Sequence, residues 1–82
     1  MKEIYVKVLS EPKTDSILSG IGSVTWYIAL WDGQEIIVNA SNATHTLPSV
    51  GSSGLIRGHF YDQRFFDDSL KKLEIPYFLI LE

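Results

Sequence analysis

The sequence predicts an α+β domain, in which a small, mostly antiparallel sheet of four to five strands carries one short helix on a face. Apolar runs of strand length recur along the chain, and an Asp-Gly pair joins two of them. One segment with apolar residues at helical spacing precedes the last run. The expected order of elements is β-β-β-β-α-β, within a single domain that covers residues 1–82.

The first predicted strand covers residues 4–9, and Pro12 ends the extended segment because proline cannot donate to a ladder. Alternation along this strand places its branched residues on one face: Ile4, Val6 and Val8. Residues 13–23 are rich in Ser and Gly and are predicted to form a connection. A short helical turn at residues 16–18, capped by Asp15, is expected within it.

A β-hairpin is predicted around Asp32-Gly33, because a type I′ turn needs positive φ at both central residues and this pair adopts it readily. Residues 24–31 form its first strand, and their nearly continuous apolar character predicts cover on both faces. Residues 34–41 form its second strand. The two-residue loop pairs, on one face, Trp31 with Gln34, Ala29 with Ile36, Tyr27 with Val38 and Thr25 with Ala40. On the other face it pairs Leu30 with Glu35, Ile28 with Ile37 and Trp26 with Asn39.

The remaining chain is expected to supply a loop and two strands that flank the helix. Residues 42–54 are predicted to form a polar loop, with a short edge strand at residues 45–47 as an alternative. Residues 55–61 form the fourth strand. The last strand, residues 77–81, is expected inside the sheet, and a place beside the first strand is one option.

The helix is predicted between these two strands. It begins at Asp67 or Asp68, whose carboxylates suit a helix start, and runs through Leu73. Phe66 and Leu70 share a face with Leu73. Pro76 keeps the residue before it extended and so ends the helix.

Composition narrows the classes of function. The chain has no Cys, so neither a disulfide nor a thiolate metal site is expected. Its net charge is −3 and its basic residues are dispersed, which disfavours nucleic-acid binding. No apolar run is long enough to span a membrane, and no signal peptide is recognised, so a cytoplasmic location is expected. No metal site and no cofactor are predicted.

Charges are scarce in the middle of the chain. Between Ser16 and Ile56 the only Asp, Glu, Lys or Arg residues are Asp32 and Glu35. Small domains usually spread charged side chains over their surfaces. We therefore interpret this stretch as a surface that a partner covers or that contacts something neutral.

The aromatic residues of the hairpin are the first candidate binding residues. Trp26 and Trp31 lie on opposite faces of the predicted strand, and Tyr27 shares a face with Trp31. Both tryptophans cannot fill one side of a small core, so one of them is expected at a rim or exposed. Trp and Tyr dominate binding hot spots. The alternative is a core with two sides, in which helix or loops cover the second face.

A second candidate group lies on one face of the fourth strand. Arg57, His59 and Tyr61 alternate there, with successive residues about 7 Å apart. Arginine binds anions, and histidine moves protons near neutral pH. With His45 as a second histidine, acid-base cleavage of a phosphodiester without a metal is conceivable. The alternative is an ordinary solvated strand face.

These features favour a non-catalytic binding module, most directly a protein-protein interaction or inhibitor-type protein, whose partner is either another protein or a second copy of the chain in a homodimer. Its proposed contacts are Trp26, Tyr27, Trp31, Arg57, His59 and Tyr61. One alternative is a small metal-independent phosphodiesterase that uses His45 and His59. Another is a protein that binds a neutral small ligand such as a sugar or nucleoside by stacking. A deep pocket floored by Trp would favour this last alternative.

Overall fold

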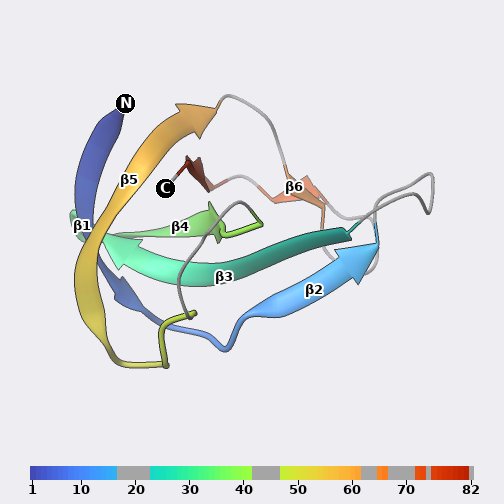
Figure 1. Cartoon of the computed structure of the whole chain (residues 1–82), viewed down its shortest axis with the longest axis horizontal. Helices are drawn as coiled ribbons and strands as arrows, with labels where there is room; N and C mark the ends of the chain where they lie inside the picture. Colours follow the sequence, from blue (N-terminus) through green and yellow to red (C-terminus); the bar gives the residue numbers. More distant parts are fainter. Residues whose placement is uncertain (17–22, 42–46, 62–64, 67–71, 74, 82) are drawn as a thin grey trace.

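The computed structural model describes residues 1–16, 23–41, 47–61, 65–66, 72–73 and 75–81. The regular elements in these ranges are strands, which curve around a common interior (Figure 1). They are β1 (Lys2–Val8), β2 (Lys13–Ser16), β3 (Ser23–Trp31), β4 (Gln34–Asn39), β5 (Ser53–Tyr61), β6 (Phe65–Phe66), β7 (Lys72–Leu73) and β8 (Tyr77–Ile80).

Five of these strands close into a barrel in the order β1-β5-β8-β4-β3. The ring closes where the end of β1 pairs with β3, so that Lys7 lies opposite Leu30 and Val8 opposite Ala29. Neighbouring barrel strands are antiparallel except β4 and β8, which are parallel. β2 lies outside the ring and pairs with the first half of β3.

The barrel contains a Greek key. β1, β3 and β4 are consecutive neighbours, and β5 returns to lie beside β1, which gives the spatial order β5-β1-β3-β4. A five-stranded barrel built on a Greek key is also the arrangement of the OB-fold. The likeness is one of strand order and by itself carries no function.

The predicted α+β fold is wrong, because the described residues contain no helix and the sheet closes on itself. Phe65–Phe66 pairs with Lys72–Leu73, where the helix was expected to end. Residues 67–71 lie outside the described residues. The apolar spacing that predicted the helix spans less than two turns, and such short runs do not distinguish helix from strand. A helix this short is also marginal without tertiary support.

Two further expectations are corrected at β2 and β8. Residues 13–16, predicted as part of a connection, form β2, while residues 17 and 18 of the expected helical turn lie outside the described ranges. The last strand is interior to the sheet as predicted, but it lies between β5 and β4 and not beside β1. A parallel neighbour needs a long crossover, and β5 and the residues after it supply one between β4 and β8. No helix in the described ranges is long and apolar enough to cross a bilayer.

The predicted hairpin is confirmed in its turn and its register. Asp32 and Gly33 have φ values of 50° and 77°, as a type I′ turn requires. The pairs run from Trp31 opposite Gln34 to Trp26 opposite Asn39. Beyond the ladder, the Ala40 N–H donates to the Thr25 carbonyl at 2.7 Å. The local turn chemistry therefore sets the pairing of the two central strands.

Alternate residues of all five barrel strands fill the interior. The buried cluster consists of Ile4, Val6, Val8, Tyr27, Ala29, Ile36, Val38, Ala40, Phe78 and Ile80. Trp31, Ile56 and Phe60 pack against it and are partly buried. The Trp31 and Phe60 rings have centroids 4.9 Å apart, and those of Phe60 and Phe78 are 4.8 Å apart. These three rings close one end of the barrel, which we call the aromatic end.

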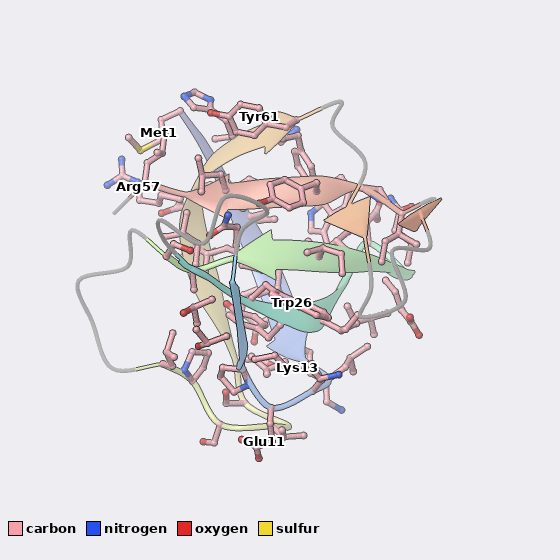
Figure 2. All side chains as sticks on the ribbon, turned by 90° about the vertical axis from the view of Figure 1, so that its right-hand side faces the viewer. Met1, Glu11, Lys13, Trp26, Arg57 and Tyr61 are labelled. Carbon is pink, nitrogen blue, oxygen red and sulfur yellow. The ribbon has the colours of Figure 1, made fainter. Side chains whose placement is uncertain are left out.

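A second buried layer lies outside the barrel wall. Trp26, Ile37 and Asn39 alternate with core residues and so face away from the interior, yet each is buried. The Asn39 side chain donates to the Tyr77 hydroxyl and accepts the Ser41 N–H at 2.8 Å. The Lys13 ammonium lies 5.3 Å from the centre of the Trp26 ring (Figure 2). β3 and β4 are therefore buried on both faces around Trp26, Ile37 and Asn39, whereas Leu30 and Glu35 beside the turn are exposed.

Candidate functional site

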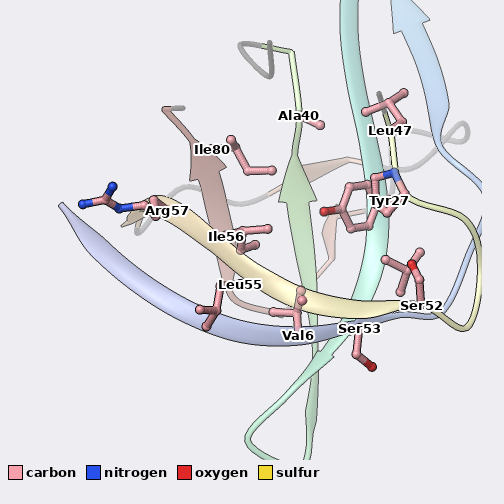
Figure 3. A pocket seen from close by; sticks show the side chains of 13 residues that line it. Val6, Tyr27, Ala40, Leu47, Ser52, Ser53, Leu55, Ile56, Arg57 and Ile80 are labelled. Atoms are coloured by element: carbon pink, nitrogen blue, oxygen red, sulfur yellow. The ribbon is translucent and has the colours of Figure 1, made fainter. Parts of the chain in front are cut away.

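The candidate site is a cavity at the end of the barrel opposite the aromatic end. We call it the barrel-end cavity, and its volume is about 340 Å³. All five barrel strands or the residues just after them line it, together with Leu47, Pro48 and Ser52 of the loop before β5 (Figure 3). Its lining is mostly aliphatic, with Val6, Val8, Ala40, Leu47, Ile56 and Ile80 among its members.

Small residues on the inner face of β5 leave this space unfilled. Gly54 and Gly58 alternate there with Ile56 and Phe60. A Cβ added at Gly54 would meet no heavy atom within 4 Å, whereas one added at Gly58 would overlap the Leu79 carbonyl. Gly58 thus lets β8 pack closely against β5, and Gly54 opens the cavity.

Tyr27 forms the buried aromatic wall of the cavity. Tyr27 is 0% exposed, and its hydroxyl has no hydrogen-bond partner among the described residues. Figure 3 shows the hydroxyl directed from β3 toward Ile56 on the opposite wall. Burial raises the pKa of Tyr27 to about 12, because the phenolate would be poorly solvated. The group is therefore a protonated, unsatisfied donor at physiological pH.

Of the predicted binding residues, Tyr27 and Arg57 border the cavity. The Arg57 side chain points away from Tyr27 (Figure 3), and its Nε lies 3.9 Å from a Glu3 carboxylate oxygen. Trp26 is buried in the outer layer, 5% exposed. Trp31 lies at the aromatic end, where the Lys2 ammonium is 5.9 Å from its ring centre. The structure thus separates the three hairpin aromatics into three different environments.

His59 and Tyr61 share the outward face of β5 with Arg57, as the alternation predicts. The Tyr61 ring lies 6.5 Å from that of Tyr77. His45 lies outside the described residues, so its predicted pairing with His59 has no counterpart among them. Within the described ranges no group of three His, Asp or Glu residues is placed to hold a metal ion.

The residues that the sequence reasoning missed are those that create the cavity. Gly54 of β5, Ala40 just after β4 and Ile80 of β8 come from segments that are distant in the sequence. One usable signal was present: Gly54 and Gly58 fall on the same face of a strand that also carries Ile56 and Phe60. Two glycines on the apolar face of a strand indicate missing core volume or a close approach of backbone.

An exposed apolar pair lies on the outer wall of the barrel. Tyr5 on β1 is paired with Leu55 on β5, and the two are 63% and 61% exposed. Glu3 and Arg57 form the next outward pair along the same two strands. We call these four residues the β1–β5 outer face.

Comparison with known proteins assigns no relative to the chain. No family model matches the sequence, and neither the curated proteins nor the solved structures contain a significant match. The function must therefore be argued from the site itself.

Proposed function

We propose that this protein is a non-catalytic binding protein that holds a neutral small molecule in the barrel-end cavity. The observation that carries the proposal is the cavity of about 340 Å³ with its mostly aliphatic lining. Ligand sites commonly have volumes of about 300–1,000 Å³, apolar walls and few polar groups. The mouths of β-barrels are among the places where such sites occur.

The geometry supports this function better than the other classes. Contact with a protein through the hairpin aromatics would need exposed rings, but Trp26 and Tyr27 are buried. The phosphodiesterase hypothesis would need two histidines facing one substrate, and among the described residues only His59 is placed. A cytoplasmic location remains part of the proposal.

Binding of simple probes to the purified protein tests the proposal. We expect ethylbenzene, acetophenone or indole to raise the thermal unfolding temperature and to give saturable binding by calorimetry. The variant Gly54→Leu should fill the cavity without a backbone clash and weaken probe binding at least tenfold. Lys7→Leu adds the same side chain at an exposed position of β1 and should bind like the wild type.

Two outcomes would contradict the proposal. The first is that none of the three probes binds the wild-type protein. The second is that Gly54→Leu folds and binds them as tightly as the wild type does. Thermal unfolding of each variant in the absence of probe establishes that it is folded.

A second candidate function, self-association, is favoured by the β1–β5 outer face. Tyr5 and Leu55 form an exposed apolar pair at the centre of this face. In a two-fold contact between copies, Glu3 of one copy would face Arg57 of the other, so the charges would be complementary. Sedimentation equilibrium should then show dimers whose dissociation constant rises at least tenfold in Leu55→Lys. A wild-type protein that stays monomeric at millimolar concentration would exclude this function.

A further inference from the structure

We propose that the barrel-end cavity selects uncharged ligands that carry a carbonyl or similar acceptor on an apolar body, and that the Tyr27 hydroxyl donates a hydrogen bond to this acceptor. This inference rests on the proposed function and specifies the ligand's chemistry. It depends on two observations: the cavity is mostly aliphatic, and Tyr27 in its lining has a buried hydroxyl without a hydrogen-bond partner among the described residues.

The Tyr27 hydroxyl is held where a ligand would need it. Tyr27 pairs with Val38 in the central hairpin, so its backbone cannot shift independently of the barrel wall. The residue is 0% exposed and its hydroxyl finds no partner among the described residues. Buried polar groups are nearly always hydrogen-bonded, and an orphan buried hydroxyl destabilises the fold. A ligand acceptor would supply the missing partner.

The cavity lining excludes a charged ligand. Among the described lining residues there is no Asp, Glu, Lys or His, and the one basic residue among them, Arg57, turns its side chain away toward Glu3 (Figure 3). An ion placed inside would lose its hydration without gaining a buried counter-charge, which is strongly unfavourable. Besides Tyr27, two described lining residues carry hydroxyl groups: Ser52 in the loop before β5 and Ser53 at the start of β5. The Ser52 hydroxyl already donates to the Ser49 carbonyl.

Ligand entry must open a path to the hydroxyl, because solvent does not reach it in this structure. Ile56 is partly buried and lies on the wall that the hydroxyl faces (Figure 3). A rotamer change at Ile56 is a small motion compared with opening the strand ladder. The apolar body of the ligand then replaces the contacts that this side chain gives up.

A matched pair of probes isolates the hydrogen bond. Acetophenone and ethylbenzene have nearly the same shape, but acetophenone alone has a carbonyl oxygen. We expect Tyr27→Phe to weaken acetophenone binding about fivefold to tenfold, the usual net contribution of one hydrogen bond. Ethylbenzene should bind the variant at least as tightly as it binds the wild type. Tyr5→Phe removes an exposed hydroxyl and should change neither affinity.

A second measurement does not depend on a variant. The infrared carbonyl stretch of acetophenone bound to the wild-type protein should lie below its value in a hydrocarbon solvent, because a donated hydrogen bond weakens the C=O bond. A stretch at the hydrocarbon value would overturn the inference.

The outcomes separate this inference from the proposed function. If both probes bind and Tyr27→Phe leaves their affinity ratio unchanged, the role of the hydroxyl is wrong while ligand binding stands. If neither probe binds the wild-type protein, both the proposed function and the inference fail. A loss of ethylbenzene binding equal to that of acetophenone in Tyr27→Phe would indicate a packing role for Tyr27 and would also overturn the inference.

Discussion

At the scale of single residues, Tyr27 combines a structural role with a polar group that the structure leaves unsatisfied. Its ring packs in the barrel core beside Val38 and Ala29, whereas its hydroxyl has no hydrogen-bond partner among the described residues. Groups that reduce stability persist where function requires them. The stability of a variant that lacks only this oxygen therefore reports on its role.

Replacing Tyr27 by Phe should increase the free energy of unfolding by about 1 kcal/mol, because an unsatisfied buried hydroxyl costs roughly that much or more. Urea denaturation measures the change. The control is Tyr5→Phe, where the ring is exposed and a change within about 0.5 kcal/mol is expected. A clear loss of stability in Tyr27→Phe would mean that the hydroxyl is satisfied in the folded protein.

The raised pKa of Tyr27 also predicts how stability depends on pH. The pKa rises from 10.0 to about 12 on folding, so the folded state holds the proton more tightly than the unfolded state. Titration of Tyr27 therefore leaves the free energy of unfolding at its full value below pH 10. As pH rises from 10 toward 12, this free energy falls by up to about 1.4 kcal/mol per pH unit. Denaturation of the wild type and of Tyr27→Phe at intervals from pH 9 to 12 isolates this contribution. Equal slopes in the two proteins would contradict it.

At the scale of elements, β5 shows how two glycines on one face serve different purposes. A Cβ at Gly58 would overlap the Leu79 carbonyl, whereas one at Gly54, which lines the barrel-end cavity, would meet no heavy atom within 4 Å. β5 pairs with β1 along one edge and with β8 along the other, so a defect at Gly58 affects the closure of the ring.

We expect Gly58→Ala to destabilise the protein by about 3 kcal/mol, because β8 must move away from β5 to admit the methyl group. Gly54→Ala is the matched control on the same face of the same strand, and it should be neutral or slightly stabilising. Thermal unfolding compares the two variants. Equal stabilities would contradict the packing described for β5 and β8.

The Asp32-Gly33 turn makes a separate prediction. Because Gly33 has a φ of 77°, Gly33→Ala should cost about 1 kcal/mol of unfolding free energy, measured by urea denaturation. Asp32→Asn retains a residue that tolerates positive φ and should be nearly neutral. If Gly33→Ala is as stable as the wild type, the turn is not the type I′ turn described.

Local signals explain which elements the sequence could predict. The Asp32-Gly33 dipeptide and the two apolar runs beside it predicted the hairpin. Alternation of apolar and polar residues predicted the faces of β1 and β5. The ring closure between β1 and β3 and the parallel pairing of β4 with β8 join segments that are distant in the sequence, and no local pattern encodes them. The helix prediction failed for the same reason, since propensity in a short window yields to tertiary pairing.

At the scale of the whole molecule, the scarcity of charge between residues 16 and 56 has a structural explanation. β3 and β4 occupy the centre of this stretch. Their inward residues are buried in the barrel, and Trp26, Ile37 and Asn39 are buried in the outer layer. A two-sided core of this kind is the alternative that the sequence allows to an exposed aromatic surface. Tyr27 could be named as a candidate from its residue type. The cavity could not be foreseen, because residues from four strands and the residue just after β4 create it.

The two ends of the barrel differ in a way that locates the site. Trp31, Phe60 and Phe78 fill the aromatic end with rings in tilted and edge-to-face contact, while Gly54 and Ala40 leave the other end open. Large side chains thus stabilise one end, and the other provides space for a ligand.

The most direct test of ligand binding at this end is an NMR titration of the uniformly ¹⁵N-labelled protein with acetophenone. Saturable shifts are expected for the amides of Val8, Ala40 and Gly54, which are distant in the sequence and meet at the cavity. The amides of Asp32 and Gly33, at the turn between β3 and β4, should not shift. Ligand binding in the barrel-end cavity would be contradicted by the absence of saturable shifts, or by shifts confined to residues that do not line it.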